Sequence, residues 1–297
     1  MPKSSTWLAA LAVAAVSGGA ALANPQECQA LAGQYTAARP VAAGPDLNNY
    51  VFKAADKGCL ELMRTLLADG GSVVMRRGSG ETALHHAATA GEVEVAKLLL
   101  AQGAEINQRD LKGSTALFLA AENNRVVMVE LLLAQHADAA ITGRSDVTPL
   151  SAAAFNGNQR VVEALLSVGV DPKPADSTGK SAILYAANRG FATVVERLLA
   201  AGIDVNASYG HELTALMWAA GYAEDVPEDE GVKTVTLLID KGAKLDPTDD
   251  RGYSALMTAA GLGHEAVVEL LKARGANSAL VGKDGKSAVE LAASAGK

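Results

Sequence analysis

The hydrophobic positions of this chain follow one pattern that repeats along most of its length. A Ser or Thr is followed by an aliphatic residue two positions later and by Ala-Ala at the fifth and sixth positions after it. The pattern begins at Thr82, Thr115, Thr148, Ser181, Thr214, Ser254 and Ser287. These starts are 33 residues apart, except for a spacing of 40 between Thr214 and Ser254, and a degenerate copy begins at Asn49, 33 residues before Thr82. A fixed period of this length predicts a solenoid of stacked repeats.

Two short helices are predicted in each repeat. The Ser or Thr is a natural N-cap for the first helix, and the paired alanines allow neighbouring helices to approach closely. The second helix carries apolar residues three and four positions apart, as at Val161 and Leu165. A Gly after most second helices permits the left-handed conformation that ends them. His136 replaces this Gly in one copy, where we expect backbone strain on the order of 1 kcal/mol and no functional role.

The full repeat resembles the ankyrin repeat. It approximates Asp-x-x-Gly-x-Thr-x-Leu-x-x-Ala-Ala-x-x-Gly-x-x-x-Val-Val-x-Leu-Leu-x-x-Gly-Ala, with Asp/Gly turns such as residues 176–179. The resemblance covers residues 46–297 and implies an all-α ankyrin-repeat solenoid of about eight helix-turn-helix repeats, the first degenerate, joined by β-turn or hairpin loops. The family's Thr-Pro-Leu-His motif is seldom intact, since only Pro149 keeps its proline and only His85 keeps its histidine. Weaker hydrogen bonding between repeats through this histidine is therefore expected.

Residues 1–23 have the pattern of a secretory signal peptide. Lys3 provides the positive start, an apolar run follows at residues 7–16, and Ala21-Leu22-Ala23 is a small-x-small cleavage site. The run is shorter than the roughly 20 residues that a membrane span needs, although an N-terminal anchor is the alternative. We expect cleavage after Ala23 and a periplasmic or secreted protein without membrane insertion. With this leader, the chain is similar to bacterial secreted or periplasmic ankyrin-repeat proteins.

Residues 24–45 are expected to form a capping helix and a linker. Pro25 suits the first turn of a helix, and Cys28, Leu31 and Tyr35 recur on one face. Such a helix would cover the exposed end of the first repeat. The chain has two cysteines, Cys28 and Cys59. An even count in an oxidising compartment predicts one disulfide between them, and two free thiols are the alternative.

Charge and motifs argue against several functions. The net charge of −7 provides no basic field for nucleic acid or anionic lipid. His264-Glu265 lacks the second histidine of a zinc-protease motif, and His85 and His86 diverge on a helix, so they cannot share a metal. His85 matches the structural histidine of the family, and we expect His86 to be exposed toward the concave side. The sequence thus predicts no enzyme, no cofactor and no metal site.

The 40-residue spacing places a 7-residue insertion between the two helices of one repeat, near residues 223–231. Five of these nine residues are acidic. Insertions in repeat arrays map to loops, often on the binding face. We expect a solvated acidic loop, with Ca²⁺ or a basic partner as the alternative ligand.

The family resemblance implies a partner surface on the turn tips and the exposed side of the first helices. Matched position by position, the candidate partner-binding residues are Phe155, Asn156, Tyr185, Asn188, Arg189, Tyr209, Trp218 and Tyr222. Phe155, Tyr185, Trp218 and Tyr222 are expected to be apolar anchors, because aromatic side chains dominate interface energy. Trp218 and Tyr222, four residues apart, would share one helix face. Lys53, Glu122, Arg189 and the acidic insertion would form a polar rim. The alternative is that several aromatics fill gaps between repeats.

The sequence therefore predicts a non-catalytic, monomeric scaffold that binds an unidentified protein outside the cytoplasm. One alternative is an accessory partner of a single periplasmic enzyme, which the resemblance links to oxidative-stress defence. The other is a secreted effector that binds host proteins.

Overall fold

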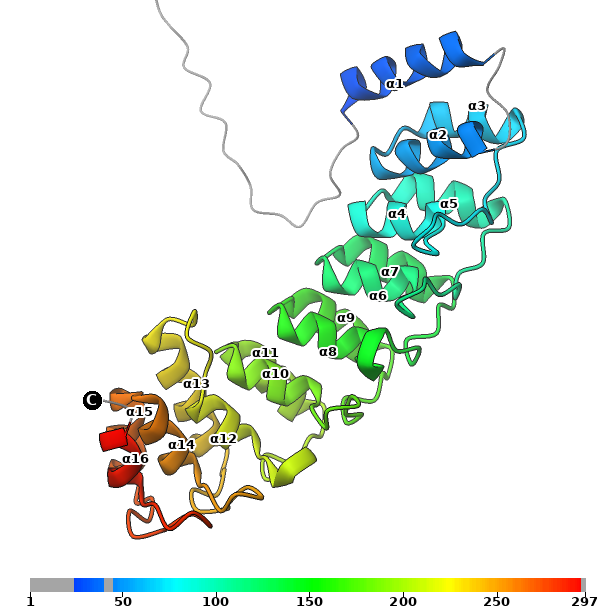
Figure 1. Cartoon of the computed structure of the whole chain (residues 1–297). Coiled ribbons are helices and arrows are strands. Elements are labelled where there is room, and N and C mark those ends of the chain that lie inside the picture. The colour runs from blue at the N-terminus through cyan, green and yellow to red at the C-terminus, as the bar shows by residue number, and fades with distance from the viewer. Residues whose placement is uncertain (1–23, 40–44, 295–297) are drawn as a thin grey trace, which may run out of the picture.

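The computed structural model describes residues 24–39 and 45–294, which form pairs of antiparallel helices stacked into one curved array (Figure 1). The predicted signal peptide and linker residues 40–44 lie outside the described residues. The first helices of the repeats are α2 (Pro45–Asp56), α4 (Ala83–Ala90), α6 (Ala116–Glu122), α8 (Pro149–Phe155), α10 (Ala182–Asn188), α12 (Ala215–Ala220), α14 (Ala255–Leu262) and α16 (Ala288–Ser294). The second helices are α3 (Leu60–Ala68), α5 (Val93–Ala101), α7 (Val126–Ala134), α9 (Gln159–Ser167), α11 (Ala192–Ala200), α13 (Glu228–Asp240) and α15 (Glu265–Ala273). The expected all-α solenoid is confirmed.

The repeated Ser and Thr residues cap the first helices as the sequence predicts. The Thr115 hydroxyl accepts a hydrogen bond from the backbone N–H of Phe118 at the start of α6. Thr148, Thr214 and Ser254 do the same in α8, α12 and α14. Each cap satisfies a backbone donor that the first turn of a helix leaves free.

One continuous core runs through the array between the two layers of helices. Its centre consists of the paired alanines together with one large aliphatic side chain from each first helix, such as Leu84 and Leu117. The second helices add the apolar residues seen in the sequence, including Val161 and Leu165. Because the alanines occupy little space, each first helix packs closely on the next.

His85 joins two adjacent repeats. Its Nδ1 accepts a hydrogen bond from the Thr82 N–H at 3.2 Å, and its Nε2 lies 3.1 Å from the carbonyl oxygen of Ser114 in the next repeat. Nε2 therefore carries the proton and donates to that oxygen. Burial, which outweighs the charges of Asp110 and Glu81, lowers the pKa of His85 below its ordinary value of 6.5. The ring is neutral and structural.

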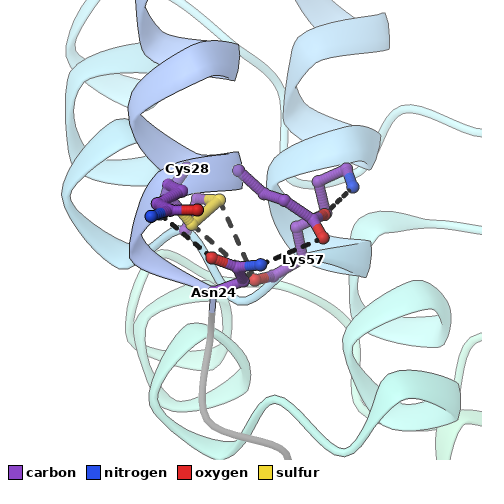
Figure 2. The surroundings of a disulfide bond; sticks show 6 residues. Asn24, Cys28 and Lys57 are labelled. Carbon is purple, nitrogen blue, oxygen red and sulfur yellow. Dashed lines mark hydrogen bonds and ion pairs between the residues drawn. A yellow bond between two sulfur atoms is a disulfide. The ribbon is translucent and has the colours of Figure 1, made fainter.

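A disulfide and two polar groups fasten α1 (Pro25–Ala38) to the first repeat. Cys28 is bonded to Cys59 at the start of α3, and Figure 2 shows Asn24, Cys28 and Lys57 gathered around this bond. Lys57 forms an ion pair with Glu27. At the other end of α1, the buried Tyr35 hydroxyl donates to Asp69. The helix thus covers the start of the array, as its apolar face predicted.

The turns between repeats, which we call fingers, have two forms. In the fingers at residues 109–114 and 176–181, a Gly takes the left-handed conformation that it adopts without strain. In the fingers at 143–148 and 209–214, Asp146 and Glu212 occupy that position with φ of 60° and 59°. A non-Gly residue there costs about 1–2 kcal/mol, so these two fingers are strained. His136 shows the same left-handed φ, 63°, as expected from its place after a second helix.

The insertion forms part of a helix as well as a loop, which corrects the expectation of a solvated acidic loop. α13 has 13 residues where the neighbouring α11 has 9, and Glu228, Asp229 and Glu230 make its first turn. Carboxylates at a helix N-terminus are stabilised by the helix dipole. Asp225, in the loop before α13, binds Arg189 of the preceding repeat. No helix within residues 24–39 and 45–294 is long and apolar enough to cross a membrane.

Candidate functional site

Three first helices bring aromatic side chains to one side of the array. Phe155 ends α8, Tyr185 lies in α10 and Trp218 in α12. The Phe155 side chain is 44% exposed, which is unusual for a Phe in a folded protein. The rings of Phe155 and Tyr185 meet edge to face, with centroids 5.6 Å apart. We use the name aromatic surface for the four residues Phe155, Tyr185, Trp218 and Arg189.

Arg189 links the aromatic surface to the insertion. Its guanidinium carbon lies 5.4 Å from the centre of the Phe155 ring, at cation–π distance. Its Nη1 donates to Asp225 at 2.6 Å, while its buried Nε has no hydrogen-bond partner in the described part of the chain. The insertion therefore fixes the cation that packs on the exposed ring.

Tyr185 is held in one orientation by a finger. Its hydroxyl donates to Asp176, which also accepts hydrogen bonds from Thr178 and from the N–H of Lys180. Burial and the hydrogen bond to Asp176 raise the pKa of Tyr185 well above its ordinary value. Although burial disfavours its charged form, the hydrogen bonds from Tyr185 and Thr178 hold the pKa of Asp176 below the ordinary value. At neutral pH the pair is therefore a neutral phenol and a carboxylate.

Trp218 is half-buried and lies beside a second cation. The Lys180 ammonium is 5.4 Å from the centre of its ring. The ring borders a shallow pocket of about 240 Å³, whose other walls include Met217, Arg251 and the exposed Leu262. Two of the three aromatic side chains thus carry a cation on their faces, and the third, Tyr185, is held by its hydrogen bond to Asp176.

A larger groove, of about 420 Å³, lies between the first helices and the fingers. Phe118, Ala152, Phe155 and Tyr185 form its apolar floor. Lys112, Arg144 and Lys180 line it from three successive fingers. We call this space the finger groove. The sequence reasoning missed these three cations, although their positions in the turn tips were visible in the repeat pattern.

The structure separates Tyr222 from the other candidate residues. α12 ends at Ala220, so Tyr222 does not share a helix face with Trp218. Its side chain is 8% exposed and stacks on His264 with ring centroids 3.8 Å apart. The insertion redirects the chain here, and the Tyr222 ring fills the space beside Gly231. The expectation that Tyr222 is an exposed anchor is therefore wrong.

Other candidate residues have structural contacts. Asn156 is exposed, and its amide donates to the backbone oxygens of Glu122 and Ala152. Asn188 donates to the oxygen of Gly221, and the Tyr209 ring packs partly buried against the core. These side chains support the aromatic surface more than they extend it.

The two predicted rim residues Glu122 and Lys53 lie far apart, and His86 is more buried than expected. Glu122 is exposed at the edge of the finger groove, but Lys53 lies on α2, far along the array, beside Tyr50. His86 does not point freely toward the concave side. Its side chain is 12% exposed and its Nδ1 lies 2.7 Å from Asp56 Oδ1. Within the described residues, no group of three or more His, Cys, Asp or Glu side chains is arranged to hold a metal ion.

Comparison with known proteins agrees with this architecture. The family model for ankyrin repeats (three copies) matches residues 20–110, 107–176, 150–227 and 226–297. The crystal structure of the human ASB11 ankyrin repeat domain superposes with a TM-score of 0.68 and 28% sequence identity, covering 80% of this chain and 100% of that chain. No curated protein sequence matches the chain significantly. The repeat spacing, the helix pairs and these matches together show that the chain belongs to the ankyrin-repeat family.

Proposed function

We propose that the chain is a non-catalytic scaffold that binds a partner protein through the aromatic surface, outside the cytoplasm. Ankyrin repeats imply protein–protein interaction in general. The observation that supports this location of the binding site is the exposed Phe155 ring, which packs between Tyr185 and Arg189. Aromatic residues and Arg in fixed positions are the groups that contribute most to protein interfaces. A surface already held by its neighbours also loses little entropy on binding.

Two features support the location. Residues 1–23 have the pattern of a cleavable signal peptide. A disulfide such as Cys28–Cys59 is typical of an oxidising compartment, because such bonds are rare where glutathione keeps thiols reduced. Mass spectrometry of the protein from the periplasm or medium should find an N-terminus at Asn24. A full-length chain retained in the cell membrane would contradict this location.

Crosslinked capture from the native compartment tests the binding site. Phe155→Ser should reduce the yield of captured partner by about tenfold or more, because it removes a ring at the centre of the surface. Val168→Ser is the matched control, since Val168 is 58% exposed and lies at the end of a second helix. Circular dichroism should show that both variants keep the helical fold. Equal yields from the two variants would refute the aromatic surface as the binding site.

A further inference from the structure

The repeat of α16 exposes side chains at positions that are buried in the other repeats. In each of those repeats, the aliphatic residue two positions after the Ser, Thr or Asn that begins it is at most 1% exposed. In α16 this residue is Val289, which is 71% exposed. The second of the paired alanines, Ala293, is exposed as well, whereas Ala88 and Ala121 are fully buried. α16, at one end of the array, thus has the sequence of a core helix where part of the core is open (Figure 1).

The neighbouring α15 is uncovered in the same way. Val268 of α15 is half-buried, whereas its equivalents in α9 and α11, Val162 and Val195, are fully buried. Between α15 and α16 lies a groove of about 490 Å³, which we call the terminal groove. Its apolar walls consist of Ala260, Val268, Ala288, Val289, Ala292 and Ala293.

The earlier repeats show what covers the equivalent surface. α13, for example, packs against both the first helix of its own repeat, α12, and the preceding second helix, α11. The matching position beside α16 and α15 is the terminal groove. Within residues 24–39 and 45–294, no second helix follows α16. The groove therefore has the shape and the apolar lining that receive an amphipathic helix elsewhere in this molecule.

Ion pairs between successive second helices add a charge preference. Glu163 of α9 binds Arg197 of α11 at 2.8 Å, and Glu196 of α11 binds Lys241, which follows α13, at 3.1 Å. Glu269 has the position of Glu163 and Glu196 in its own repeat, and it lines the terminal groove. In the earlier repeats the carboxylate at this position thus meets a base of the next second helix.

The charged lining of the terminal groove agrees with this preference. It consists of Glu265, Glu269 and Lys272, so carboxylates exceed bases by one. Lys272 binds Glu269 along α15 at 3.1 Å, and both side chains are well exposed. Such a surface pair contributes little energy and can be exchanged for another. A basic residue beside the apolar face of an occupant would balance the remaining charge.

We infer that the terminal groove binds an amphipathic helix of another protein. The helix lies relative to α15 and α16 as α13 lies relative to α11 and α12. Its apolar residues cover Val268 and Val289, and a basic residue meets Glu269. Burial of these apolar side chains drives the binding, as in other complexes where a helix fills a groove.

A second copy of this chain has no free helix to donate within its described residues. The apolar faces of its second helices are buried in its own core, as at Val161 and Leu165. Leu31 and Tyr35 of α1 are buried as well. Donating any of these helices would open a folded repeat. The terminal groove is also separate from the aromatic surface on α8–α12, so this inference does not rest on the proposed function.

Fluorescence anisotropy with a peptide copy of α11 tests the inference. The probe is a fluorescein-labelled peptide of residues 190–203, with a lactam bridge between Glu196 and Ala200→Lys on its exposed face. The bridge keeps the peptide helical, because isolated helices this short are marginal in water. The probe should bind the full chain, and a counterpart with Val194→Ser and Leu198→Ser should bind about tenfold more weakly or worse. Equal binding of the two peptides would overturn the inference.

Matched variants of the full chain locate the binding. Val289→Ser should weaken binding of the probe by about tenfold, because it removes an apolar contact from the wall of the groove. Val281→Ser is the control, since Val281 is 59% exposed in the same repeat and lies outside the groove. Circular dichroism should show the same helical content in both variants. Equal affinities of the two variants for the probe would overturn the inference.

A charge exchange tests the register of the helix. Glu269→Lys in the full chain should weaken binding of the probe by about two- to fivefold, and a probe with Arg197→Glu should restore it. If the exchanged probe binds the Glu269→Lys protein no better than the original probe does, the occupant does not lie as a second helix and the inference is wrong.

Sedimentation velocity separates another protein from a second copy as the occupant. The full chain should sediment as a monomer at concentrations up to about that at which the probe saturates the groove. A dimer that Val289→Ser dissociates would overturn the inference, by showing that a second copy of the chain covers the groove.

Discussion

The repeats that begin at Thr82 and Ser181 share one frame and present different surfaces. In both, the aliphatic residue after the cap is fully buried, as Leu84 and as Ile183. The residue four positions after the Ser or Thr differs between the two repeats. His86 lies against Phe52 and binds Asp56, whereas Tyr185 borders the finger groove.

The residue seven positions after the Ser or Thr shows the same contrast between the repeats that begin at Thr82 and Thr148. Thr89 of α4 turns its hydroxyl back to its own helix, where it donates to the oxygen of His85. Phe155 of α8, at the equivalent position, presents a large apolar ring to solvent. The difference teaches that the period specifies the solenoid, while the residues between the periodic positions determine where a partner binds.

The largest expected effect comes from the shared frame. Leu84→Ala and Ile183→Ala should each lower the free energy of unfolding by about 2–5 kcal/mol, because each leaves a cavity in a fully buried position. Chemical denaturation followed by circular dichroism measures both. Similar losses would support one common frame, and a loss confined to one variant would contradict it.

Removing the disulfide should lower the stability of the solenoid without changing partner binding at the aromatic surface. Cys28→Ser with Cys59→Ser opens a link between residues 31 apart and should cost about 3 kcal/mol of stability in the chain-entropy account. The aromatic surface lies on α8–α12, so partner capture by the still folded variant should be unchanged. Loss of capture in a variant with normal circular dichroism would contradict this separation.

His85→Leu makes the repeat that begins at Thr82 resemble the repeat of Tyr185, where Leu184 occupies the equivalent position. The variant should lose about 1–2 kcal/mol at pH 7.5, because the Thr82 N–H and the Ser114 oxygen each lose a hydrogen bond in a buried site.

The pH dependence of this difference follows from the lowered pKa of His85. A histidine with a depressed pKa in the folded state contributes fully above the unfolded value of about 6.5. Below that pH the unfolded chain binds the proton first, so the wild type loses stability that the Leu variant cannot lose. Denaturation at pH 7.5 and 5.0 should show a smaller gap at the lower pH. A gap that widens on acidification would contradict a neutral, structural His85.

The smallest effect concerns the two strained fingers beside the aromatic surface. Asp146→Gly and Glu212→Gly place Gly where the finger at residues 109–114 already has it. Each should change thermal stability by no more than about +1 kcal/mol, because relief of the left-handed strain is partly offset by the greater entropy of Gly in the unfolded chain. Calorimetry measures the change, and a marked loss of stability would show that these side chains hold the fingers through contacts of their own.

The solenoid frame could be predicted from the sequence because it is periodic. The Ser and Thr caps, the buried alanines, the left-handed His136 and the Cys28–Cys59 bridge all follow from local pattern or from simple counting. The burial of Tyr222 was not predicted, because the insertion ends α12 early and folds the ring into the core. A fixed residue spacing does not indicate such a change of direction.

The cations of the finger groove were not predicted as site residues, for a different reason. Lys112, Arg144 and Lys180 are ordinary turn residues in the sequence. Only the three-dimensional arrangement of the fingers shows that they line one groove together with the carboxylates of Asp110 and Asp176.

Site-specific photo-crosslinking compares the two surfaces most directly. A photoreactive phenylalanine analogue is placed at position 155 in one protein and at position 89 in another, because both sites are exposed and equivalent in the repeat. In the native compartment, the probe at position 155 should crosslink a partner and the probe at position 89 should not. Equal crosslinking at both positions, or crosslinking at position 89 alone, would contradict the claim that the aromatic surface is where this solenoid binds.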